Sequence, residues 1–346
     1  MEIRTYSVHE LQAIADDVGE RRGWDFGRMA TERDPVPWDF MDVVAAFLRP
    51  TDVVLDIGTG GGERLVRLAS AYASGVGVDP DPAMIRVARS NARGVPNVRF
   101  LQASAEHLAP LEGEAFDVVL TRHAPVDVAE LNRVTKSGGL FLCQGVGARN
   151  MANIRRAFNT GSEAAYLDAH QSVLRDLSAR SWHLVTEAQY DVRYRVKDVP
   201  SLIFWFKAIA GANEVPADFS VATHHEVINA LIHEFGTPRG LATNEHRTLI
   251  IARKPDGSGR GHRLAQVNTQ LQACLWVSPR GTPGVSRHSP LSISPINWPR
   301  NCSAAAASLA LGMPCQPVIC TSPSLHSPPI GASASSEAQV IRSSLS

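Results

Sequence analysis

The sequence predicts an α/β fold built on a doubly wound, mostly parallel sheet. The first observation is Val53–Ile57, a run suited to a buried strand, which leads directly into a glycine cluster and then into helical periodicity. The second is the continued alternation of short apolar runs with amphipathic segments up to Gln144. The third is Asp79, which lies 21 residues after Gly58. A doubly wound sheet places an acid at this spacing against ribose hydroxyls.

Length and composition set the outer limits. A chain of 346 residues allows one large domain or two smaller ones. No apolar segment reaches the roughly 18 residues of a membrane helix, and no basic stretch followed by an apolar run begins the chain. We therefore expect a cytoplasmic protein without a membrane partner.

Charge is balanced overall, with 34 basic and 34 acidic residues, but it is unevenly spread. After Lys254 there are six arginines and only two acids, so the preceding body is mildly acidic, at about −4. An acidic body argues against a nucleic-acid partner without excluding a local basic groove. Only Cys143 of the five cysteines precedes this tail, and no ligand spacing indicates a metal site.

Residues 1–50 are expected to form a helical N-terminal cap, because apolar positions recur at helical spacing over 8–22 and 39–48. The aromatic residues between these two helices are Trp24, Phe26 and Trp38. They either pack the cap or let it close over a ligand.

The central part alternates strands and helices. The predicted strands are 53–57, 76–79, 98–102, 116–120 and 140–144, and the predicted helices are 63–73, 81–93 and 125–135. Residues 149–180 are expected to be helical with a break at 159–161, and 183–195 is expected to be a strand. Two further helices, 199–210 and 224–235, fall in an insertion at about 197–236 that could act as a substrate lid. Thr248–Pro255 is a final apolar strand.

Residues 256–346 differ from the body in having many serines and prolines and no sustained periodicity. We expect this tail to be disordered. Its composition after a natural end point also suggests translation past the usual stop. An in-frame stop near codon 256 in close relatives would support that hypothesis.

The glycine cluster narrows the family. Glu63 occupies the third glycine position of the dinucleotide fingerprint, which excludes that motif, and no Lys-Ser/Thr pair follows as in a P-loop. The pattern Asp56-x-Gly58-x-Gly60-x-Gly62 resembles motif I of the class I S-adenosylmethionine-dependent methyltransferases, in the form of the bacterial methyltransferase type 11 group. The run 131–139 resembles a second stretch of that family, with Ser137 in place of proline. A purely structural glycine turn is the alternative.

This resemblance implies a Rossmann-like, seven-stranded sheet whose last strand is antiparallel beside the fifth. It also implies S-adenosyl-L-methionine as the cofactor, with a methyltransferase domain over 51–255. The residues that it assigns to the cofactor are Asp56, Gly58, Thr59, Gly60, Asp79, Pro80, Ser104, Ala105 and Thr121. Asp56 and the glycine turn would take the amino-acid end, Asp79 the ribose and Ser104-Ala105 the adenine. Many members have an aspartate where this chain has Ser104, so the adenine contact would lack charge assistance. Asp79 could alternatively cap the next helix.

The segment after the fourth strand faces the methyl group in this family, and here it reads Thr121-Arg122-His123-Ala124-Pro125. His123 is the candidate general base, because its reference pKa lies near working pH. Arg122 could hold an acidic substrate or the cofactor carboxylate. His123 could instead only cap the next helix or bond to the backbone.

The acceptor is not named by the sequence. The signatures of adenine or glutamine amino-methylation and of cytosine C5 chemistry are absent from 121–125. Residues that could line an acceptor pocket are Gln144, Gly145, Gly147, Asn150, Tyr190, Trp205 and Phe206. The leading hypothesis is a methyltransferase acting on a small molecule. The alternatives are a non-catalytic S-adenosylmethionine-binding regulatory protein and an RNA methyltransferase.

Overall fold

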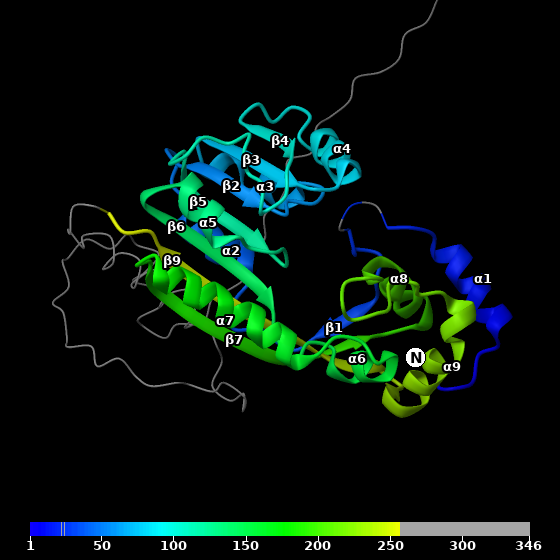
Figure 1. Ribbon diagram of the computed structural model, residues 1–346. Helices are drawn as coiled ribbons and strands as arrows, with labels where there is room; N and C mark the ends of the chain where they lie inside the picture. Colours follow the sequence, from blue (N-terminus) through cyan, green and yellow to red (C-terminus); the bar gives the residue numbers. More distant parts are fainter. Residues whose placement is uncertain (22, 24, 257–346) are drawn as a thin grey trace, which may run out of the picture. The chain divides into compact units, whose positions relative to one another are not determined.

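The computed structural model describes residues 1–21, 23 and 25–256 (Figure 1). Trp24 and the predicted tail beyond Asp256, with its proposed disorder and read-through origin, lie outside the described residues. No helix in the described part is long and apolar enough to cross a membrane.

The sheet confirms the predicted doubly wound topology. Its seven longer strands are β2 (Val53–Ile57), β3 (Ser74–Asp79), β4 (Val98–Gln102), β5 (Phe116–Arg122), β6 (Thr135–Val146), β7 (His183–Val196) and β9 (Gly240–Arg253). Strands β4, β3, β2, β5 and β6 lie in that order and pair in parallel. The last strand, β9, lies antiparallel between β6 and β7, so the predicted antiparallel strand beside the fifth is also confirmed. Strand order reverses between β2 and β5, which is where open α/β sheets bind ligands.

Two short strands bring the sheet to nine strands within the described residues. Both were missed by the prediction: β1 (Thr31–Arg33) pairs with β7, and β8 (Gly236–Thr237) pairs with β9. The predicted start of β9 at Thr248 was also wrong. Residues 240–247 are not an apolar run, and they stay extended because β7 hydrogen-bonds them throughout, from Val196 opposite Leu241 onwards.

The helices follow the predicted order with shifted ends. They are α1 (Val8–Val18), α2 (Phe40–Phe47), α3 (Glu63–Arg67), α4 (Pro82–Asn91), α5 (Val128–Val134), α6 (Ala152–Phe158), α7 (Glu163–Ala179), α8 (Val199–Ile209) and α9 (Val221–Phe235). The predicted helix 63–73 is shorter: α3 ends at Arg67 and a 3₁₀ turn, Ala69–Ala71, follows it. Helix α5 begins three residues later than predicted, because Asp127 is its N-cap and accepts a hydrogen bond from Glu130 N.

Three apolar clusters hold the fold together. One covers the sheet face under α2, α3 and α4, with Phe40, Leu65 and Leu120 among its buried members. A second covers the opposite face under α5 and α7. The third joins α1, α6, α8 and α9 with the adjoining ends of β7 and β9. Helices on both faces bury the strands as a doubly wound sheet requires.

The expected N-terminal cap is divided between two of these clusters. Helix α2 packs on the sheet, whereas α1 contacts α8 and α9. Trp38 likewise lies on the sheet face: it is 5% exposed, and its ring meets Tyr190 edge-on at 4.7 Å between centroids. A single cap over 1–50 is therefore replaced by two separate packing sites, because the apolar faces of the two helices have different partners.

The N-terminal segment is fastened by Asn229, a buried amide on α9. Its Oδ1 accepts from Tyr6 N at 2.8 Å and its Nδ2 donates to Tyr6 O at 2.9 Å and to His225 O at 3.0 Å. One side chain thus satisfies both backbone groups of Tyr6.

We expect Asn229→Ala to destabilise the protein by about 2–3 kcal/mol, because it leaves buried backbone groups of Tyr6 without partners. Urea unfolding followed by circular dichroism measures this change. The control is Gln12→Ala, which removes an exposed amide bonded only to Asp16 and should cost under about 0.5 kcal/mol. Equal effects of the two substitutions would contradict the fastening role of Asn229.

Candidate functional site

The site begins at the turn after β2, whose shape depends on glycine. Gly58 and Gly62 both have left-handed backbone angles, with φ of 71° and 73°. A Cβ at Gly58 would lie 2.3 Å from Ala124 Cβ, and one at Gly62 would lie 2.4 Å from Phe100 Cζ. Gly58 N and Thr59 N both donate to Val78 O at 2.9 Å. The turn is therefore pressed closely onto β3 and onto the loop after β5.

Asp79 ends β3 and joins the turn to the next helix. Its side chain accepts from Gly60 N at 2.9 Å and, through the other oxygen, from Asp81 N at 3.0 Å. Asp81, not Asp79, is the N-cap of α4, so the alternative role of Asp79 as a helix cap was wrong. Asp79 is 8% exposed, and its geometry is fixed at the edge of the switch point. The adjoining Pro80 is exposed and its carbonyl accepts from Gln102 Nε2 at 3.1 Å.

Asp56 lies one strand away, near the end of β2. Its Oδ2 accepts from Thr59 Oγ1 at 2.8 Å, so the turn also braces this carboxyl. Burial raises the pKa of Asp56 to about 6, although the Thr59 bond and the positive charges of Arg64 and Arg122 oppose the rise. Asp56 is thus a carboxyl held in a site with little water and no ion pair within 4 Å among the described residues.

Ser104 and Ala105 follow β4 at the same edge of the sheet. Ser104 Oγ lies 3.5 Å from His107 Nδ1, a long contact that leaves the hydroxyl available to another partner. Ala105 is 7% exposed, whereas Glu106 and His107 face solvent, as expected for loop residues. The predicted adenine positions therefore border the same sheet edge as Asp79.

The end of β5 sends its side chains in two directions. Thr121 is fully buried, and its Oγ1 has no hydrogen-bond partner in the described part of the chain. Arg122 lies on the same face as Asp56 and Leu120. Burial lowers the pKa of Arg122 to about 10, with the charges of Arg64 and Arg247 acting in the same direction. Arg122 is therefore a costly, poorly solvated cation.

His123 follows with a left-handed backbone (φ 61°), and its N–H donates to Gln144 O at 2.9 Å. The ring reaches solvent on one side, and its Nε2 lies 3.5 Å from Gln144 Nε2. Enclosure by the site lowers the pKa of His123 well below its usual value, and three arginine charges lower it further. The imidazole is therefore neutral at neutral pH. Because Asp127 caps α5, His123 is not the cap of that helix.

A polar group on β7 and β9 completes this face, and most of it was not predicted from the sequence. Glu245 accepts from Tyr190 OH at 2.7 Å and forms ion pairs with Arg33 at 3.0 Å and Arg247 at 3.4 Å. Only Tyr190 was a candidate. Glu245 and Arg247 are two residues apart, so in a strand their side chains point to the same face of the sheet. This relation could be used only once β9 is known to start at Gly240.

The other residues that were expected to line an acceptor pocket separate into two groups. Trp38 Nε1 donates to Gln144 Oε1 at 3.2 Å, and Asn150 Oδ1 accepts from Arg247 at 2.6 Å, so Gln144 and Asn150 both contact the site. Trp205 and Phe206 belong instead to the apolar cluster of α8. Core packing therefore accounts for the positions of these two residues.

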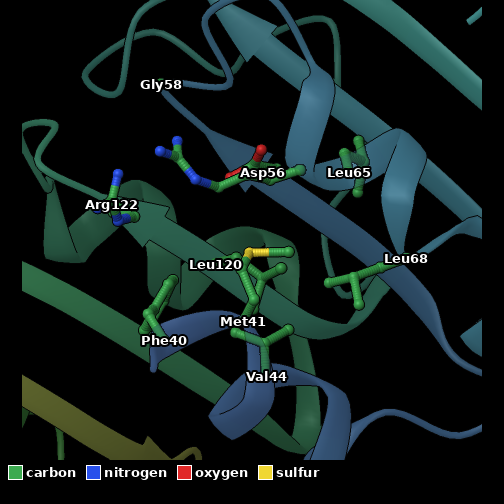
Figure 2. A pocket seen from close by; sticks show the side chains of 10 residues that line it. Phe40, Met41, Val44, Asp56, Gly58, Leu65, Leu68, Leu120 and Arg122 are labelled. Carbon is green, nitrogen blue, oxygen red and sulfur yellow. The ribbon is translucent and has the colours of Figure 1, made fainter. Parts of the chain in front are cut away.

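A pocket lies between α2, α3 and the sheet (Figure 2). Apolar side chains of α2, including Phe40 and Met41, form one wall. Asp56, Gly58 and Arg122 lie along its polar side, as the close-up shows. In the described part of the chain, no group of three His, Cys, Asp or Glu side chains could hold a metal ion.

This combination of sheet topology, glycine turn and edge acids defines the class I methyltransferase architecture. Residues 55–143 match the family model described as a methyltransferase domain. The matched region runs from Leu55 in β2 to Cys143 in β6, and so it contains the glycine turn, Asp79 and the end of β5. Over these residues, the chain is therefore similar to methyltransferase domains.

Curated relatives agree with that assignment. An uncharacterised methyltransferase, YcgJ of Bacillus subtilis, is 39% identical over 98 residues, 26% of this chain and 38% of that protein. A ubiquinone biosynthesis O-methyltransferase of Azorhizobium caulinodans is 46% identical over 26% of this chain and 32% of its own length. A malonyl-(acyl-carrier protein) O-methyltransferase of Marinomonas is 25% identical over 60% of this chain and 82% of its own length. The chain thus spans only about a third of the first two relatives.

We expect Asp56→Asn to stabilise the free protein at pH 8. The raised pKa means that the folded state disfavours the carboxylate, at roughly 1.4 kcal/mol per pKa unit. The gain should be about 3 kcal/mol well above pH 6. It should decline as the pH falls below 6 and vanish only below about pH 3, where Asp56 is protonated in both states. Urea unfolding at pH 8 and pH 4.5 measures it. A variant that is less stable than the native chain at pH 8 would contradict the buried-carboxyl assignment.

Proposed function

We propose that this chain is an S-adenosylmethionine-dependent methyltransferase that acts on a nucleophilic atom of a small molecule. The observation that carries the proposal is the meeting of Asp56, the glycine turn and Asp79 at the switch point of the sheet. S-adenosylmethionine, when bound, supplies a methyl group already activated by its positive sulfur. The main tasks left to the protein are alignment and the exclusion of water.

The residues at this edge suit the cofactor. Each Asp79 oxygen uses one lone pair on a backbone N–H and retains another that can accept from a ribose hydroxyl. Asp56 can accept from the cofactor's ammonium group, whose positive charge would favour the ionised carboxyl. The other residues proposed to contact the cofactor lie in the glycine turn, after β3 and β4, and at the end of β5. They are Gly58, Thr59, Gly60, Pro80, Ser104, Ala105 and Thr121.

The acceptor is proposed to lie beside His123, the candidate base. Its neutral ring can take a proton, but the low pKa makes it a weak base. Two relatives are named as O-methyltransferases, which favours oxygen as the receiving atom.

The segment 197–236 is proposed as the lid, within a methyltransferase domain that covers about 51–255. Glu214, in the loop between α8 and α9, accepts from Asn150 Nδ2 at 3.3 Å and from Tyr166 OH at 3.1 Å. Asn150 also accepts from Arg247. The loop is thereby linked to the polar face of the site by a chain of three side chains.

Asp79→Ala should weaken S-adenosylhomocysteine binding about ten- to hundredfold, because charge-assisted hydrogen bonds are lost. Isothermal titration calorimetry measures the affinity, and Asp168→Ala on the exposed face of α7 is the control. Unchanged affinity in a folded Asp79 variant would show that the ribose assignment is wrong.

The reaction class itself is tested with labelled methyl transfer from S-adenosylmethionine to small-molecule and RNA extracts. We expect thermal stabilisation by S-adenosylmethionine and S-adenosylhomocysteine but not by NAD, and label in the small-molecule fraction. His123→Gln should reduce this transfer about 100-fold without changing cofactor affinity. Thermal stabilisation without methyl transfer would favour a non-catalytic S-adenosylmethionine-binding protein. Label in the RNA fraction would favour an RNA methyltransferase.

A further inference from the structure

Three arginines from different parts of the chain converge beside His123. Arg64 comes from α3, Arg122 from the end of β5 and Arg247 from β9, and the charge of each lowers the pKa of His123. Arg122 pairs with Gln144 in the neighbouring strand, and Arg247 pairs with Val146, two residues further along β6. The side chains of these two pairs, Arg122 with Gln144 and Arg247 with Val146, therefore point to one face of the sheet. With strands about 4.8 Å apart, long side chains from β5 and β9 can reach a common point.

These arginines differ in their partners. Arg247 donates to Asn150 Oδ1, to the His246 carbonyl and to Glu245. Arg122 and Arg64 have no side-chain hydrogen bond and no ion pair among the described residues. A guanidinium has five N–H donors in a planar fork. The site thus contains a poorly solvated guanidinium, at Arg122, whose donors are unused.

The nearby acids do not supply the missing partner. Glu245 is already shared by Tyr190, Arg33 and Arg247. Asp56 is bonded to Thr59 and lies beyond ion-pair distance of the arginines. Asp39, the other acid that acts on Arg33, caps α2 through Met41 N. The donors of Arg122 therefore remain without a partner among the described residues, and the charge of Arg247 acts on the same guanidinium.

We propose that Arg122 and Arg247 bind an oxyanion of the methyl acceptor, a carboxylate or a phosphate ester carried on an apolar body. This inference rests on the proposed function, since it places the acceptor in that site. The apolar body is indicated by Phe40 and Met41, which line the pocket that Arg122 borders. The other source of an oxyanion is the cofactor's own carboxylate. Arg247 lies two strands from β5 and three from the glycine turn, which favours the acceptor.

The test compares acidic and neutral probes of similar shape on the full chain saturated with S-adenosylhomocysteine. The probes are phenylacetate, phenyl phosphate and the neutral phenylacetamide, and ligand-observed NMR gives their dissociation constants. We expect at least one of the two acids to bind at least tenfold more tightly than the amide. Arg122→Met and Arg247→Met should each remove most of that preference and leave amide binding unchanged. Arg99→Met, at an exposed position on the edge strand β4, is the matched control and should retain the preference.

Each contrary outcome is distinct. Equal binding of acids and amide by the native chain would overturn the inference. A tenfold or greater loss of S-adenosylhomocysteine affinity in Arg122→Met, with the acid preference intact, would assign Arg122 to the cofactor and also overturn it. Failure of the native chain to bind S-adenosylhomocysteine would instead overturn the proposed function. If Arg247→Met does not fold, Arg247→Lys replaces it in the test. This substitution keeps the charge but loses the planar guanidinium, so it should lower the preference for acids by a smaller factor.

Discussion

The position of β9 between β6 and β7 is the constraint on which the rest of the structure depends. Strand β9 has fourteen residues and pairs with β7 along almost its whole length. Its second half, from Arg247 to Arg253, also pairs with β6. This pairing joins the parallel sheet to the cluster of α1, α6, α8 and α9, because Leu241 and Val196 lie in that cluster. It also brings Glu245 and Arg247 to the carboxyl edge of β5 and β6. Without it, this side of the site would lack both charged side chains.

The sequence predicted best where a pattern is local. The glycine turn, Asp79 and the alternation of strands and helices up to β6 follow from spacing and turn chemistry, and the family model covers the same stretch. The prediction failed where long-range pairing decides the structure. Thr31–Arg33 is extended only because β7 offers it an edge, and 240–247 is extended only because β7 bonds it.

The candidate site divides in the same way. Asp56, the turn and Asp79 are contiguous with the recognised motif, so their mutual contacts could be expected. Arg247 and Glu245 could not, since they lie about 190 residues from Asp56 and reach it only through the order of the strands. Arg247 matters for the chemistry of the site, because its charge adds to burial, and to the charges of Arg122 and Arg64, in lowering the pKa of His123.

The order of the strands has a consequence for how this chain is made. Synthesis completes β6 at Val146, but the strand that covers its edge starts only at Gly240. During that interval β6 presents an open row of backbone donors and acceptors beside an apolar face, the arrangement that pairs most readily with another chain. A nascent chain therefore passes through a long stage at which aggregation competes with folding, and chaperone binding at that edge would be most valuable before β9 leaves the ribosome.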